Sequence, residues 1–111
     1  MICLDSTCII DFLRGNKEAQ NIIKKYQDQL YTTEISVFEI YLGIYNKLYI
    51  SFKEEELAEK FLNSVKILPF SGSGKQAAII SVELFRKGNI VEQNDCFIAA
   101  IMLVNGCKAI I

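Results

Sequence analysis

The stretch that decides the fold is Met1-Ile2-Cys3-Leu4-Asp5-Ser6-Thr7, at the start of the chain. Its first four residues are apolar, and the run ends on the carboxylate of Asp5, which two hydroxyls follow. Residues 8–13 then take up the apolar spacing of an amphipathic helix. We therefore predict a strand that ends at Asp5 and leads into a helix. In open α/β sheets the carboxyl ends of the strands form the edge where ligands bind, so Asp5 is a candidate site residue.

Outward from this stretch, strands alternate with helices along the rest of the chain. We predict helices at about residues 7–14, 17–28, 36–49, 53–64, 73–87 and 94–104, and further strands at about 30–33, 65–69 and 107–111. Such alternation is typical of an α/β fold with a central parallel sheet, here of about four strands. The 111 residues are expected to form a single domain. Because the chain ends inside a predicted strand, we expect that C-terminal residues of this domain are missing.

Two of the predicted helices are unusually apolar. Residues 94–104 are nearly all apolar, and the apolar set of residues 36–49 is wider than one stripe, so both helices are expected to be covered on more than one side. Tyr41, Tyr45 and Tyr49 recur four residues apart, either in the core or along a hydrophobic groove. Apolar residues make up 51% of the chain. This surplus suggests a buried partner surface.

The overall composition excludes several classes of function. The net charge is −1, so the chain has no bulk basic field for nucleic acid. It contains no histidine, which excludes Ser-His-Asp and Cys-His catalysis. The four cysteines form no C-x-x-C pair, which argues against a zinc site. No signal peptide is recognisable, and no apolar run approaches the ~20 residues of a membrane span. A cytoplasmic location away from membranes is expected.

Three acids occupy unusual places for solvated charges. Asp5 ends the first strand, Glu39 sits among apolar residues, and Asp95 opens the most apolar helix. A parallel sheet would gather these positions along one edge. Hard cations such as Mg²⁺ and Mn²⁺ prefer carboxylate oxygens and need no nitrogen or sulfur ligand. We therefore predict a catalytic metal site made by the three acids, in which at least one carboxyl group has a raised pKa when no metal is bound.

Each of these acids also has an ordinary structural explanation. An acid such as Asp5 is favourable near the N-terminus of the helix that follows. Ser36-x-x-Glu39 fits a capping box, in which the glutamate bonds the backbone N–H of the capping residue. Asn94-Asp95 fits a common helix start. These explanations treat the acids separately, and none of them accounts for a shared edge.

Three motifs together resemble a known family. They are Asp5-Ser6-Thr7 after the first strand, Ser36-x-x-Glu39 with Gly43 four residues on, and Asp95-Cys96-Phe97-Ile98-Ala99-Ala100. In order and spacing they are similar to the PIN-domain ribonucleases, and above all to the VapC-type toxins of toxin–antitoxin pairs. The resemblance covers essentially the whole chain. It implies a three-layer α/β/α fold in which the first strand lies in the middle of the sheet beside the fourth.

The resemblance also implies roles for particular residues. Asp5 and Asp95 would ligate Mg²⁺ or Mn²⁺, and Glu39 would ligate the metal or position a metal-bound water that hydrolyses RNA. Thr7 would be a supporting hydroxyl, as would Ser36 of the second motif. Members of the family bind the helical tail of an antitoxin in a groove, and they form dimers. We therefore expect an antitoxin partner and a homodimer.

Two alternatives remain open. The family pattern continues beyond the fourth strand with a further polar or acidic group, and this chain ends before it. A PIN-like binding module that has lost catalysis is therefore the main rival. The other rival is a phosphate-ester hydrolase with Asp5 as nucleophile. That chemistry wants a second acid close behind the first and a nearby lysine, which the spacing of Asp5 and Asp11 does not supply.

Overall fold

The computed structural model describes residues 1–107 and 109–111. Along the chain the elements are β1 (Ile2–Cys3), α1 (Ser6–Leu13), α2 (Lys17–Lys25), the short 3-10 helix η1 (Gln27–Gln29), β2 (Leu30–Thr33), α3 (Glu34–Tyr45), α4 (Phe52–Leu62), β3 (Lys66–Leu68), α5 (Gly74–Arg86), α6 (Gln93–Asn105) and β4 (Ala109–Ile110). The predicted alternation of strands and helices is confirmed. Lys108, which the sequence places in the fourth strand, lies outside the described residues.

The four strands form one parallel sheet in the order β3-β2-β1-β4. Ile2 is in register with Leu30 of β2 on one side and with Ala109 of β4 on the other. The prediction of a central first strand beside the fourth is thus confirmed. The order reverses between β1 and β4, so the carboxyl end of β1 is the switch point where α/β sheets bind ligands.

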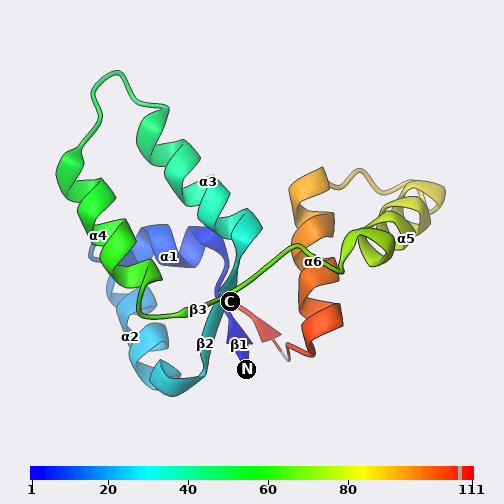
Figure 1. Ribbon diagram of the computed structural model, residues 1–111, viewed down its shortest axis with the longest axis horizontal. Coiled ribbons are helices and arrows are strands. Elements are labelled where there is room, and N and C mark those ends of the chain that lie inside the picture. The colour runs from blue at the N-terminus through cyan, green and yellow to red at the C-terminus, as the bar shows by residue number, and fades with distance from the viewer. Residues whose placement is uncertain (108) are drawn as a thin grey trace.

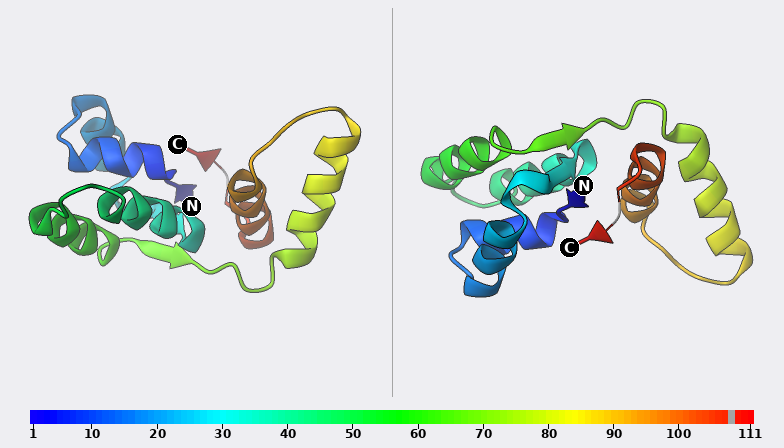
Figure 2. Two further views of the ribbon diagram at one scale, coloured as in Figure 1. Left: turned by 90° about the horizontal axis from the view of Figure 1, so that it is seen from above. Right: turned by 90° about the horizontal axis from the view of Figure 1, so that it is seen from below.

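Helices lie on both sides of the sheet, as the predicted three-layer fold requires. α1 to α4 gather on one side, and α5 and α6 form a pair on the other (Figures 1 and 2). The main core lies on the first side, where Leu4, which follows β1, meets apolar residues of β2 and the four helices. It is made of Leu4, Ile9, Ile23, Leu30, Ile40, Ile44, Ala58 and Leu62. None of the described helices is long and apolar enough to cross a membrane.

The start of α3 differs from the sequence prediction. The helix begins at Glu34, and the side chain of Thr33 caps it by accepting a hydrogen bond from the backbone N–H of Ser36 at 3.1 Å. The predicted capping box of Ser36 and Glu39 is therefore wrong, because Thr33 already occupies the capping position. The carboxylate of Glu39 is left available for other contacts.

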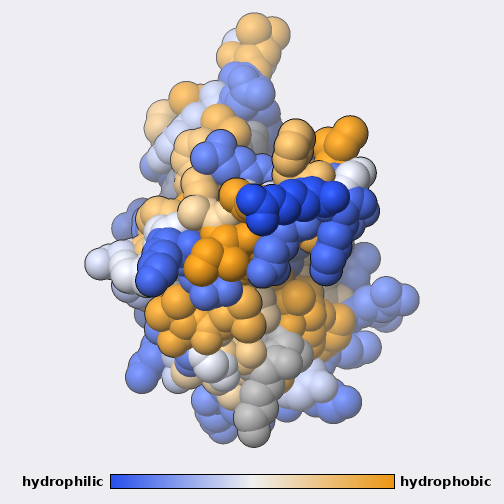
Figure 3. Space-filling model, turned by 90° about the vertical axis from the view of Figure 1, so that its right-hand side faces the viewer, coloured by the Kyte–Doolittle hydropathy of each residue, from blue (hydrophilic) through white to orange (hydrophobic). Residues whose placement is uncertain are grey.

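α3 and α6 are covered on more than one side, as predicted, but each also keeps apolar residues open to solvent. On α3, Phe38 is 54% exposed and Leu42 is 51% exposed, whereas on α6 Leu103 is 64% exposed. α3 packs against β2, α1, α4 and α6, whereas α6 packs against α5 and α3. Figure 3 shows apolar side chains among charged ones on the side formed by α5 and α6. The apolar surplus of the chain thus lies partly at the surface, where large apolar patches mark contact sites.

Candidate active site

Asp5 follows β1 directly and is held by backbone contacts on both sides. Its N–H donates to the carbonyl of Ile111 at 2.7 Å, and its carbonyl accepts from the N–H of Ile9 at 3.2 Å. Asp5 is the N-cap residue of α1, but its side chain makes no capping hydrogen bond. The backbone therefore fixes where Asp5 stands and leaves its carboxylate free.

Glu39 reaches the same corner from α3. Its Oε1 accepts a hydrogen bond from the Oγ of Ser6 at 3.3 Å, which ties the second turn of α3 to the first residue of α1. Ser6 is 9% exposed, so this contact lies at the edge of the core. The sequence analysis had not singled out Ser6, although it stands next to Asp5 in the first motif.

The two hydroxyls that the sequence analysis had chosen lie elsewhere. Thr7 is exposed, and no hydrogen bond of its side chain appears among those of the described residues. Ser36 is fully buried, and its Oγ accepts a hydrogen bond from the Oγ1 of Thr33 at 3.3 Å. Ser36 thus helps to fix the start of α3, and the supporting roles proposed for Thr7 and Ser36 stay predictions.

Asp95 comes to the site from the other half of the molecule, in the first turn of α6. Two residues later, Phe97 packs edge-on against Phe70, with ring centroids 4.8 Å apart. Because Phe70 lies in the loop after β3, this contact fixes the rotation of α6 against the carboxyl edge of the sheet. The packing of Phe97 against Phe70 therefore holds the N-terminal turn of α6 in place.

Electrostatics shows that the three acids share one neighbourhood. The pKa of Glu39 is raised above its usual value of 4.5, first because the group is partly buried and then because the negative charges of Asp5 and Asp95 act on it. Hydrogen bonding from Ser6 and from Asn94 opposes this rise in the pKa. Asn94, another residue that the sequence analysis did not choose for the site, therefore contacts Glu39 from α6.

The donor set suits a hard divalent cation. Three carboxylates with a hydroxyl and an amide nearby offer only oxygen ligands, which Mg²⁺ and Mn²⁺ prefer. Within residues 1–107 and 109–111, no three acidic or cysteine side chains stand close enough together to enclose one ion. The three acids of the site therefore do not form a closed set of ligands in this part of the chain.

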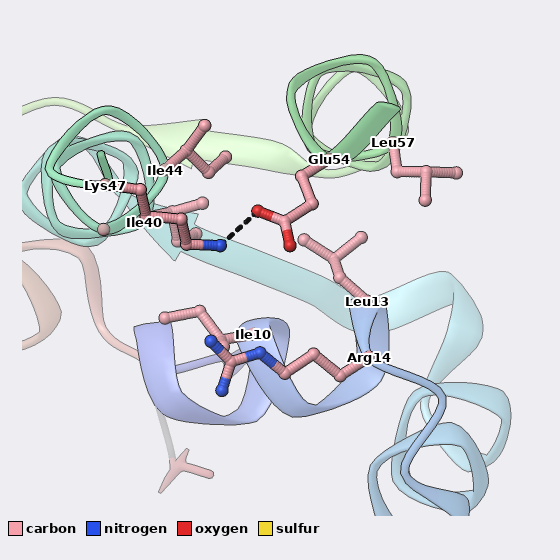
Figure 4. Close-up of a pocket in the computed structure, with 9 residues that line it drawn as sticks. Ile10, Leu13, Arg14, Ile40, Ile44, Lys47, Glu54 and Leu57 are labelled. Atoms are coloured by element: carbon pink, nitrogen blue, oxygen red, sulfur yellow. Dashed lines mark hydrogen bonds and ion pairs between the residues drawn. The ribbon is translucent and has the colours of Figure 1, made fainter. Parts of the chain in front are cut away.

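A separate groove lies between α1, α3 and α4, away from the acids. Its volume is about 250 Å³, and it is lined by Ile10, Leu13, Arg14, Ile40, Gly43, Ile44, Lys47, Glu54 and Leu57. Lys47, two residues after the end of α3, forms an ion pair with Glu54 of α4 across it (Figure 4). The groove therefore has apolar walls with Arg14 on the side of α1.

Solved structures share this fold at low sequence identity. VapBC2 from Rickettsia felis bound to a DNA fragment from its promoter is 18% identical with a TM-score of 0.86, and the match covers 98% of this chain and 85% of that one. A toxin–antitoxin complex from Klebsiella pneumoniae is 17% identical with a TM-score of 0.80, covering 100% and 85%. FitAcB from Neisseria gonorrhoeae is 23% identical with a TM-score of 0.81, covering 98% and 85%.

A search of curated protein sequences gives no significant match. A family model, by contrast, covers nearly the whole chain, because the model of the PIN domain matches residues 2–111. The parallel sheet with β1 beside β4 agrees with this match. The chain belongs to the PIN domain family.

Proposed function

We propose that this protein is a metal-dependent endoribonuclease of the VapC type, formed by a single PIN domain. The observation that carries the proposal is the 3.3 Å hydrogen bond from Ser6 to Glu39, since it holds this acid beside the residue that follows Asp5. Burial, and then the charges of Asp5 and Asp95, also raise the pKa of Glu39. Membership of the PIN domain family supports the same chemistry. Because the net charge of the chain is −1, its overall charge does not neutralise a phosphodiester, and a bound metal ion would do so.

In this proposal each acid has a separate task. Asp5 and Asp95 would hold Mg²⁺ or Mn²⁺, which when bound neutralises phosphate charge and makes a coordinated water more acidic. Glu39 would accept a proton from the attacking water on a carboxylate oxygen, and a raised pKa makes it a better proton acceptor near neutral pH. The hydroxyl of Ser6 orients that carboxylate through its 3.3 Å hydrogen bond.

RNA cleavage tests the proposal directly. We expect the purified protein to cut single-stranded RNA with Mg²⁺ or Mn²⁺ and to lose this activity in EDTA. Asp5→Asn and Asp95→Asn should each lower kcat by at least about a hundredfold, whereas Asp11→Asn removes a carboxylate that lies outside the site and should leave kcat near wild type. Activity that persists in EDTA or in Asp5→Asn would refute the proposal.

An antitoxin is the proposed protein partner. One of the structural neighbours reported above is described as a toxin–antitoxin complex. The groove between α1, α3 and α4 is apolar and suits an amphipathic helix of such a partner. A stable complex without any RNA cleavage or metal binding would instead favour the catalytically impaired binding module.

We also propose that the protein forms a homodimer. Apolar side chains on α5 and α6 are open to solvent, among them Val82, Phe85 and Leu103. Phe85 alone is 82% exposed, which is costly for an isolated chain and reasonable for an interface. Sedimentation equilibrium should give twice the chain mass of 12.6 kDa, and a monomer at all concentrations would contradict this proposal.

A further inference from the structure

Three successive residues of α3 lie in three different environments. Phe38 is 54% exposed, Glu39 faces Ser6 in the candidate site, and Ile40 is 1% exposed in the core. Successive residues of an α-helix differ by ~100°, so the open face of Phe38 begins where the site ends. Leu42 lies one turn beyond Phe38 on the same open face and is 51% exposed.

The charge of the protein makes this open aromatic ring significant. A single strand of RNA is usually held by a basic groove together with aromatic side chains on which bases stack. Here the net charge is −1 and the site is acidic, so phosphate attraction outside the metal is weak. Binding free energy must then come from other contacts, and stacking on an aromatic ring supplies it for any base.

We propose that Phe38 is a substrate-positioning residue that stacks on a base of single-stranded RNA next to the phosphate at Glu39. The inference rests on the proposed nuclease function and adds a binding subsite to it. Other exposed aromatic residues of the described chain, such as Tyr49, Phe52 and Phe85, lie farther along their helices or on other elements. Phe38 is adjacent to a site acid on the same helical turn.

Kinetics separates stacking from a structural role. Phe38→Leu keeps an apolar side chain but removes the ring, so we expect KM for RNA to rise about tenfold or more with kcat little changed. Phe38→Tyr should restore the wild-type KM. Phe52→Leu, at a residue that is 80% exposed at the start of α4, is the matched control and should leave KM unchanged. If Phe38→Leu has a wild-type KM, the inference fails while the nuclease proposal stands.

Fluorescence tests the same contact without cleavage. The chain has no tryptophan, so Phe38→Trp introduces a single reporter. In an Asp95→Asn background with Mg²⁺, a single-stranded oligoribonucleotide should quench this reporter, whereas an abasic oligonucleotide of equal length should not. Phe52→Trp in the same background should respond to neither. This experiment gives an answer even if the wild-type protein cuts no RNA.

Two results would overturn the inference. One is equal quenching by the intact and the abasic oligonucleotide, because stacking requires bases. The other is a tryptophan emission of the Phe38→Trp variant that shifts to shorter wavelength as the protein concentration rises and does not change when RNA is added. The second result would mean that a second copy of the chain covers this face, and sedimentation of the same samples would show the association.

Discussion

Glu39 stands three residues after Ser36, and this spacing suits both a helix cap and a catalytic site. The structure separates the two explanations, because Thr33 caps α3 and the Glu39 carboxylate accepts its hydrogen bond from Ser6 instead. Sequence patterns identified the residue but left its partner open. The partner lies 33 residues away, and a contact at that distance depends on how α1 and α3 pack.

Replacing Glu39 with Gln should change how stability depends on pH. A carboxyl group with a raised pKa in the folded protein stabilises the fold below its usual pKa and loses that contribution as the pH rises through the raised value. Metal-free Glu39→Gln should therefore be more stable than wild type at about pH 7, and the gain should shrink as the pH falls toward 4.5.

Urea unfolding in EDTA at several pH values measures this effect. Glu34→Gln is the control, because Glu34 lies in the first turn of α3, where a negative charge is favourable. That variant should lose stability near neutral pH instead of gaining it. A Glu39→Gln protein that is less stable than wild type in EDTA would show that the ionised carboxylate is favourable in the fold.

Among the elements, the position of each helix could be predicted from the sequence. Which of its apolar side chains face solvent could not. Helical spacing placed α5 and α6 to within two residues of their observed ends. It did not reveal that Phe38 and Leu103 face solvent, because apolar periodicity describes a helix and not the number of its neighbours. α2 was extended by three residues for a related reason, since η1 continues the helical spacing with a tighter turn.

The cap of α3 should matter for activity as well as for stability. Thr33→Ala removes the side chain that accepts from the N–H of Ser36, which should cost about 1 kcal/mol of unfolding free energy. Because α3 carries Glu39, fraying of its first turns should also lower kcat. Urea unfolding and RNA cleavage measure the two effects separately.

Ser51→Ala is the matched control for the cap. Ser51 caps α4 through the same geometry and accepts from the N–H of Glu54 at 3.2 Å. Its loss should cost a similar amount of stability, with kcat unchanged because α4 carries no site residue. If both variants lost the same fraction of activity, the cap of α3 would have no special connection to the site.

At the scale of the whole molecule, the acids lie at the switch point of the sheet and the groove lies between helices on one side of it. Strand alternation was enough to predict where Asp5 would stand. A groove was expected, but its location could not be predicted, because its lining comes from three helices and depends on their packing angles. The surplus of apolar residues indicated a partner surface without locating it.

Filling the groove should block the partner and spare the nuclease. A Cβ added to Gly43 meets no atom within 4 Å, so a larger side chain there can enter the groove. Gly43→Leu should weaken antitoxin binding at least about tenfold while RNA cleavage by the free protein stays near wild type. It should also gain up to ~1 kcal/mol of stability, because glycine is unfavourable inside a helix.

Calorimetry with the antitoxin measures the change in affinity. Gly43→Ala is the control, because it gives the same benefit to the helix and leaves most of the groove open. Wild-type affinity in Gly43→Leu would place the partner on another surface. A large fall in RNA cleavage by Gly43→Leu would mean that the groove and the acids are not independent.

The pairing of β1 with β4 joins two segments that lie far apart in the sequence, of which β1 is synthesised first. Ile2 is in register with Ala109, and the N–H of Asp5 donates to the carbonyl of Ile111. Contacts of such long sequence separation form late, because the intervening chain must be closed first. Asp5 is therefore fixed in place only after β4 has been made, which follows Asp95 in the sequence. Removal of β4 and Ile111 would therefore free the backbone N–H of Asp5 and loosen the candidate site without removing any of its acids.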